Sequence, residues 1–80
     1  MPKVLSLEGY DFVIYLGDHE PPHVHVRRGG GEAIVTIGNG RGEAVLRQEH
    51  GLKRHELRRA IELVEDHRPQ LLGAWRQHNG

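Results

Sequence analysis

Three histidines gather around a double proline in the segment DHEPPHVHV, residues 18–26. They are His19, His23 and His25, and imidazole is the side chain that proteins use most often for metal binding and for proton transfer near neutral pH. Because side chains two positions apart on a strand point to the same side, His23, His25 and Arg27 are expected to share one face. The segment therefore predicts a strand with one chemically capable face and valines on the other.

Several kinds of chemistry fit this face, and the sequence leaves them open. His19, His23 and His25 with one water would complete an open, zinc-type metal site. His23, His25 and Arg27 could instead contact a phosphate or a nucleic acid, or two imidazoles could act as general base and general acid on a ribose 2′-hydroxyl and a leaving 5′-oxygen. The commonest explanation of such a pattern is a solvated strand face. No cofactor is therefore expected, and a divalent metal is the alternative.

A second candidate binding surface lies at the start of a predicted helix. Basic side chains occupy this start and acidic side chains fill the rear half of the helix. The helix macrodipole favours the opposite order, by ~0.3–1 kcal/mol of helix stability per charge. A positive patch that attracts a phosphate backbone or an acidic partner would explain the order. The alternative is ordinary solvation, with Arg58 and Glu62 paired across one turn. The residues concerned are Lys53, Arg54, Arg58 and Arg59, followed by Glu62, Glu65 and Asp66.

The first half of the chain has the two-residue period of strands. Strands are predicted over 3–8, 10–16, 23–28, 32–37 and 43–47, joined by Glu8-Gly9, GDHEPP, GGG and Asn39-Gly40. These turns are too short for helical crossovers, so the four or five strands are expected to form antiparallel hairpins. On the second strand, Tyr10, Phe12, Ile14 and Leu16 are expected to share one side. Tyr15 falls on the other side, so one of the two tyrosines is expected to be exposed, where it could stack on a base.

The period changes to that of a helix after Leu52. An amphipathic helix is predicted from about 53 to 67, and a second follows with Pro69 in its first turn and Trp75 as a core anchor. The two could also form one kinked helix. Strands followed by helices predict an α+β fold with the helices on one face of the sheet. We expect one domain over 1–80, with the sheet in 1–47 and the helical part in 52–78.

The bulk composition excludes some classes of protein. The chain has 11 Lys and Arg against 11 Asp and Glu and no cysteine, so overall charge does not favour a generic nucleic-acid coat, and thiolate chemistry is excluded. No apolar run approaches the ~20 residues of a membrane span. A cytoplasmic protein without a membrane partner is expected. Because a chain this short buries a small core, a homodimer or a partner chain is also expected.

Two long segments together resemble a known family. They are GYDFVIYLGDHEPPHVHVRRGGGEA and GLKRHELRRAIELVEDHRPQLLGAW, which are similar to the small bacterial and archaeal Domain-of-Unknown-Function 4160 family. The residues that match its hallmark are His19, Pro21, Pro22, His23, His25 and Arg27. The resemblance implies no known reaction. It implies an arrangement similar to toxin–antitoxin gene pairs, because such proteins are often encoded beside a second small protein.

One departure from the family concerns the predicted helix start. Relatives tend to have serine where Lys53 stands, which would give a Ser-x-x-Glu capping box with Glu56. Losing the cap side chain costs about 1 kcal/mol of helix stability.

Together these features favour a small intracellular binding module over an enzyme. The module would be one half of a toxin–antitoxin-like pair and would contact a small partner protein encoded nearby, RNA or DNA. Two alternatives stay open: a small histidine-dependent ribonuclease, phosphotransferase or metal-dependent hydrolase, and a structural dimerisation domain. Catalysis would need at least two imidazoles converging on one place. The binding candidates are His19, His23, His25 and Arg27 on the strand and Lys53, Arg54, Arg58 and Arg59 on the helix; the catalytic candidates are His23, His25 and Arg27.

Overall fold

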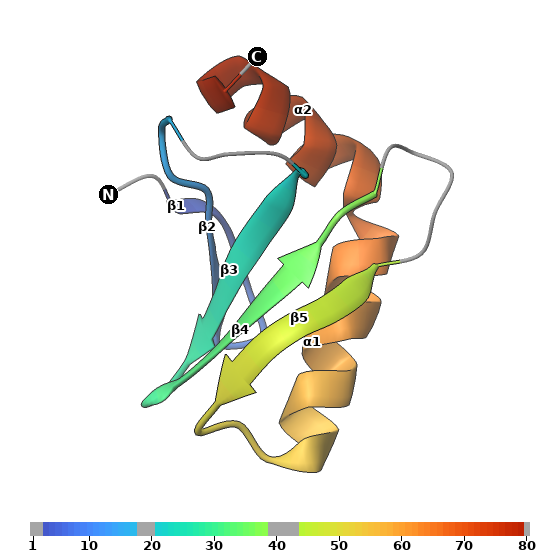
Figure 1. Ribbon diagram of the computed structural model, residues 1–80. Coiled ribbons are helices and arrows are strands. Elements are labelled where there is room, and N and C mark those ends of the chain that lie inside the picture. Colours follow the sequence, from blue (N-terminus) through green and yellow to red (C-terminus); the bar gives the residue numbers. More distant parts are fainter. Residues whose placement is uncertain (1–2, 18–20, 39–43, 80) are drawn as a thin grey trace.

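The computed structural model describes residues 3–17, 21–38 and 44–79, and these residues form an α+β fold. A five-stranded antiparallel sheet with strand order β1-β2-β3-β4-β5 precedes two helices (Figure 1), as the sequence predicts. The elements are β1 Lys3–Leu7, β2 Tyr10–Val13, β3 His23–Arg28, β4 Gly31–Thr36, β5 Val45–His50, α1 Arg54–Asp66 and α2 Arg68–Asn79. Each strand pairs with its neighbour in the chain, which places β3 at the centre of the sheet.

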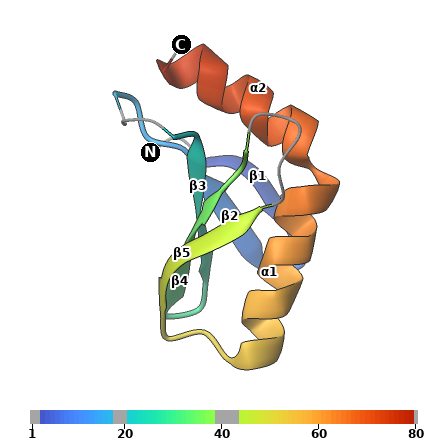
Figure 2. The same cartoon turned by 45° about the vertical axis from the view of Figure 1, so that its right-hand side comes forward.

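Both helices lie on one side of the sheet, where the hydrophobic core forms. Figure 2 shows α1 running along this face and α2 crossing its upper end. The alternation within the strands supplies the sheet side of the core, and the 3–4 spacing within the helices supplies the other side. Neither helix of the described chain is long and apolar enough to cross a membrane. The buried core includes Phe12, Val24, Val26, Ala33, Val35, Ile37, Ala60, Leu63, Val64, Leu71, Leu72 and Trp75.

The two helices are separate segments that meet at His67. The φ of −114° and ψ of 22° at this residue depart from helical values and end α1. Its Nδ1 donates to the carbonyl oxygen of Leu63 at 2.9 Å, and its own carbonyl accepts the amide of Leu71 at 2.9 Å. Pro69 lies in the first turn of α2, as predicted, where its missing N–H costs no helical hydrogen bond.

The prediction for the second strand was too long, and its consequence for Leu16 was wrong. β2 ends at Val13 because its pairing with β3 stops at the Val13–His25 pair. Beyond that point the chain turns at Gly17, which has a φ of +70°. Leu16 is 72% exposed, whereas Val13 and Ile14 are both buried. Strand alternation therefore continues for two residues past the last pair, with Ile14 in the core and Tyr15 on the opposite face, and stops at Leu16.

The last strand was predicted too early along the chain. β5 begins at Val45 and ends at His50, whereas the prediction covered 43–47. Its last four residues, Arg-Gln-Glu-His, include no apolar residue to mark a strand, and all four are exposed on this edge strand. The predicted Asn39-Gly40 turn lies outside the described residues.

The first hairpin has the expected tight turn at Glu8-Gly9. Both residues have positive φ, 53° and 81°, as a type I′ turn requires. Glu8 is the non-glycine residue of this pair. Its carboxylate accepts two hydrogen bonds from Arg59 of α1, at 2.8 and 2.5 Å. Its carbonyl accepts a further bond from Arg28 at 2.7 Å. The turn is thereby attached to both β3 and α1.

A close backbone approach joins the start of β4 to the connection between β5 and α1. A Cβ added to Gly31 would lie 2.6 Å from the carbonyl oxygen of Gly51 and 2.8 Å from a methyl group of Leu52. A Cβ on the neighbouring Gly30 would meet nothing within 4 Å. Gly31 is therefore required by packing, whereas Gly30 is not.

We predict that Gly31→Ala destabilises the fold by about 1–3 kcal/mol, the usual cost of overpacking. Gly30→Ala, the matched control, should change the free energy of unfolding by less than about 1 kcal/mol. Urea unfolding followed by the fluorescence of Trp75 measures both, since it is the only tryptophan of the chain. Equal stabilities of the two variants would contradict the close approach.

Candidate functional site

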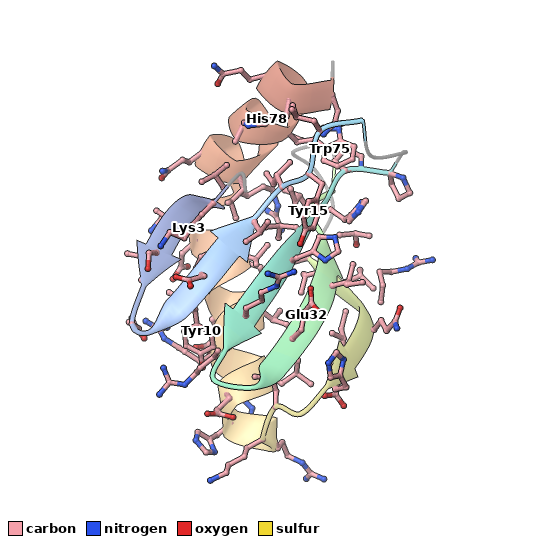
Figure 3. All side chains as sticks on the ribbon, turned by 90° about the vertical axis from the view of Figure 1, so that its left-hand side faces the viewer. Lys3, Tyr10, Tyr15, Glu32, Trp75 and His78 are labelled. Atoms are coloured by element: carbon pink, nitrogen blue, oxygen red, sulfur yellow. The ribbon has the colours of Figure 1, made fainter. Side chains whose placement is uncertain are left out.

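The polar residues of β3 lie on the outer face of the sheet, the face opposite α1. The register pairs Arg27 of β3 with Glu32 of β4, and His25 with Ile34. Figure 3 views this face, with Tyr15 and Glu32 in front of the sheet and α1 behind it. We name the group formed by Tyr15, His23, His25, Arg27 and Glu32 the histidine face. Its members come from the segment that follows β2, from β3 and from β4.

Glu32 joins the members of this group by accepting two hydrogen bonds on one oxygen. Its Oε2 accepts from Nδ1 of His25 at 3.0 Å and from Nε of Arg27 at 3.4 Å. The guanidinium of Arg27 also donates to the hydroxyl of Tyr15. Arg27 is thus fixed on two sides, by the carboxylate of Glu32 and by the phenol of Tyr15.

Four rings form a continuous series that runs from Tyr15 on the outer face to Trp75 of α2. The ring of Tyr15 meets that of His25 edge-on, with centroids 4.8 Å apart. The centroids of His23 and His25 are 5.5 Å apart, and His23 lies 5.1 Å from Trp75 of α2. Two imidazoles therefore lie next to each other on this face. His23 is only 9% exposed.

Both imidazoles are held through the same ring nitrogen. Nδ1 of His23 lies 2.9 Å from the carbonyl oxygen of Pro21, and Nδ1 of His25 lies 3.0 Å from the carboxylate of Glu32. Carbonyl and carboxylate oxygens only accept hydrogen bonds, so Nδ1 carries the proton in both rings. Nε2 is then the nitrogen that holds the lone pair whenever either ring is neutral.

The double proline places His23 at the start of β3. The carbonyl oxygen of Pro22 accepts the amide of Ile37 at 3.0 Å, which extends the β3–β4 pairing by one bond. The fixed φ of proline stiffens this entry into the strand. The carbonyl of Pro21, one residue earlier, is thereby held in reach of the His23 ring.

The charge state of Glu32 depends on its partners. Burial raises the pKa of its carboxyl, but the hydrogen bond from His25 and the positive charge of Arg27 lower it by more. The net pKa lies below the usual value of 4.5. Glu32 is therefore a carboxylate at neutral pH and accepts hydrogen bonds from both neighbours.

The basic helix start is a different surface. It lies on α1, on the other side of the sheet from Tyr15 and Glu32 of the histidine face (Figure 3). Arg59 is bound by Glu8 and, at 3.1 Å, by Glu62. The predicted Arg58–Glu62 pair is therefore replaced by an Arg59–Glu62 pair. Within the described part of the chain, Lys53, Arg54 and Arg58 are exposed and make no ion pair.

Half of the capping box survives at this helix start. Lys53 is the N-cap and makes no side-chain cap bond, as expected from its lack of an acceptor atom. Its backbone amide still donates to Glu56 at 2.9 Å. This bond is the largest cause of the lowered pKa of Glu56, and Arg28 adds to the effect.

Of the two tyrosines, Tyr15 is the partly exposed one. Tyr10 is buried, its hydroxyl donates to the carbonyl of Glu56 at 2.9 Å, and the guanidinium of Arg28 lies 5.0 Å from its ring centroid. Tyr10 is therefore a structural residue. Trp75 is 2% exposed, which confirms it as a core anchor that also contacts the site.

The three-histidine metal site stays a prediction. Among the described residues, no group of three or more histidine, cysteine, aspartate or glutamate side chains is placed to hold a metal ion. His19, the third proposed ligand, lies outside the described residues.

Sequence reasoning missed Glu32, although the signal was present. If Gly29 and Gly30 form a two-residue hairpin loop, Arg28 pairs with Gly31 and Arg27 pairs with Glu32. Tyr15 was predicted on the side of its strand away from Tyr10, where an exposed tyrosine could stack on a base, but its contacts with His25 and Arg27 had no sequence signal, because it lies beyond the last paired residue of β2.

The fold and the site define a small α+β domain whose outer sheet face carries two neighbouring imidazoles, an arginine and a carboxylate. The chain belongs to the family described as "Domain of unknown function (DUF4160)", whose model matches residues 9–76. The match runs from the first hairpin to α2 and includes all five members of the histidine face. Searches of curated proteins and of solved structures gave no match.

We predict that Glu32→Gln destabilises the protein at neutral pH and much less in acid. Because the folded-state pKa of Glu32 is depressed, its stabilisation is present above about pH 4.5 and is lost as the pH falls through the folded-state pKa. Unfolding by urea between pH 3 and pH 7 measures the difference between wild type and variant.

The matched control is Glu65→Gln, at an exposed position on α1. Its difference from wild type should stay small over the same pH range. A Glu32→Gln difference that does not shrink on acidification would contradict the role of its carboxylate charge.

Proposed function

We propose that this domain is a cytoplasmic binding module for single-stranded RNA and one half of a toxin–antitoxin-like pair. The histidine face is its RNA-binding surface. The observation that carries the proposal is the series of ring contacts from Tyr15 to His23, beside the guanidinium of Arg27, on the outer face of the sheet. Rings and guanidinium groups on a sheet are what splayed-out, single-stranded bases stack on.

The parts of the histidine face suit different parts of a nucleotide. Tyr15 is partly exposed and offers its ring for stacking. Arg27, with 36% of its side chain exposed, offers a positive charge to a phosphate. Because Glu32 and Tyr15 hold this guanidinium in place, little conformational entropy is lost when it binds.

A protein partner is the less favoured occupant of this surface. A contiguous exposed apolar patch larger than a few hundred Å² marks many protein interfaces. Within the described residues, the exposed large apolar side chains are Leu16, beyond the end of β2, and Val45, at the start of β5. The chemistry of the outer face is instead that of rings and charges.

We predict that Arg27→Gln weakens RNA binding roughly tenfold, the loss expected for one charge-assisted contact of about 1.4 kcal/mol. The probe is a fluorescent 2′-O-methyl RNA of about 12 nucleotides, a length that a small sheet can span. Fluorescence anisotropy gives the Kd. Affinity should fall as salt rises, because counterions are released from each neutralised phosphate.

Arg76→Gln is the matched control, since it removes the same charge from an exposed position on α2. It should leave the Kd within about twofold of wild type. The pair Arg54→Gln and Arg58→Gln tests the basic helix start in the same assay, and a smaller effect than Arg27→Gln is expected. Equal affinities of wild type and Arg27→Gln, or no salt dependence, would contradict the proposal.

The pairing with a neighbouring gene product has its own test. Production of this domain alone, of the protein encoded beside its gene alone, and of both together is induced in a bacterium. We predict that one of the two slows growth alone and that co-production restores it. Unimpaired growth in all three cultures would refute the toxin–antitoxin role and leave RNA binding to be judged by its affinity.

A further inference from the structure

We infer that the histidine face also cleaves RNA, by attack of a ribose 2′-hydroxyl on the adjacent phosphate, with His25 as general base and His23 as general acid. This inference rests on the proposed function, because the cleaved RNA is the one bound there. It goes further by assigning a reaction, its products and a role to each member of the site.

The surroundings of His25 fit a general base. Glu32 accepts the Nδ1 proton at 3.0 Å and so leaves the lone pair on Nε2, the nitrogen that takes up a proton from substrate. The carboxylate also stabilises the imidazolium that forms when Nε2 is protonated. Glu32 therefore acts through His25 and is a positioning residue.

The surroundings of His23 fit a general acid. Its Nδ1 proton is held by the carbonyl of Pro21, so Nε2 exchanges the second proton. The indole ring of Trp75 packs against this imidazole, with the ring centroids 5.1 Å apart, and helps to hold it in position. A separation of 5.5 Å between the two imidazole centroids allows one ring to serve the attacking oxygen and the other the leaving oxygen of a single phosphate.

The reaction balances without an external oxidant, reductant or water. Nε2 of His25 takes the proton of the 2′-hydroxyl, and the 2′-oxygen forms a bond to phosphorus. The bond from phosphorus to the 5′-oxygen breaks, and Nε2 of His23 gives its proton to that oxygen. The products are a 2′,3′-cyclic phosphate and a 5′-hydroxyl end. Exchange with solvent then returns both imidazoles to their starting states.

Arg27 and Tyr15 act on the charge that develops during this step. Negative charge accumulates on the non-bridging oxygens of the phosphorane, where fixed donors lower the barrier more than mobile ones do. Arg27 is such a donor because Glu32 and Tyr15 hold it, and its guanidinium lies 6.0 Å from the Tyr15 ring centroid. The contacts of Arg27 with Glu32 and Tyr15 therefore both shape the binding surface and position the positive charge of the guanidinium.

The first test uses purified wild type, His25→Ala and His23→Ala on a labelled single-stranded RNA, with mass spectrometry of the products. We expect wild type to give fragments that end in 2′,3′-cyclic phosphate. The cleavage rate of each variant should be at least about 100-fold lower than that of wild type. His55→Ala is the matched control, since this histidine is exposed on α1, and it should cleave like wild type. Cleavage that is equal in wild type and His25→Ala would overturn the inference.

Binding of the 2′-O-methyl RNA separates the two levels of the proposal, because this RNA lacks the attacking hydroxyl. A wild-type protein that binds it but leaves natural RNA intact overturns cleavage and keeps the RNA-binding function. A wild-type protein that binds neither RNA overturns both. Amide NMR spectra verify that each variant is folded.

A second measurement covers the case in which the histidine variants do not fold. The ¹⁵N shifts of the His25 ring report which nitrogen carries the proton, and we expect the Nδ1–H form in wild type. Glu32→Gln should add the Nε2–H form and slow cleavage, an effect that a purely structural glutamate would not have. A wild-type ring with its proton on Nε2 at neutral pH would overturn the assignment of His25 as general base.

Discussion

The register of the hairpin between β3 and β4 is the constraint on which both the core and the site depend. The pairing of Arg28 with Gly31 closes this hairpin around Gly29 and Gly30, and Gly29 has the positive φ of 58° that such a turn needs. A shift of one residue would move every side chain of β3 to the opposite face. The valines would then leave the core, and His25 and Arg27 would enter it. The apolar burial that stabilises the fold therefore also fixes which side chains form the histidine face.

The outer face differs from an ordinary solvated strand face because its polar groups are partly buried and bound to one another. The side chains of His25 and Glu32 are only 16% and 26% exposed, and Val13 of the same face is 1% exposed. No buried side-chain nitrogen or oxygen in the described part of the chain lacks a hydrogen-bond partner. A satisfied network of this kind rigidifies its members. Stability and the proposed RNA binding thus depend on the same few contacts.

The reversed charge order of α1 has a structural explanation that the helix alone does not show. Arg59 donates hydrogen bonds to the carboxylate of Glu8 in the first hairpin. Arg28 of β3 donates to the carboxylate of Glu56 at 3.1 Å. The helix macrodipole favours acids at this end by a small, screened amount, whereas these contacts tie the sheet to the helix at specific points. Part of the basic helix start therefore serves the fold, which is why the strand face is the stronger candidate for binding RNA.

The α+β class, the centre of the sheet, the helix positions and the first turn could all be predicted from the sequence, because each depends on a local period or a local turn. The end of β2, the position of β5 and the contacts of Tyr15 with His25 and Arg27 could not, since each is decided by residues distant in the chain. Among the histidines, too, contacts with nearby residues of the chain differ from contacts with distant ones. Nδ1 of His67 and of His78 each donates to a carbonyl four residues earlier, at 2.9 and 2.8 Å, so a fixed ring proton is common here and is not by itself a sign of chemistry. His25 differs because its acceptor is a charged carboxylate from another strand and a second imidazole lies beside it. Cross-strand neighbours of this kind, rather than the His-x-His motif itself, are what make this face a candidate site.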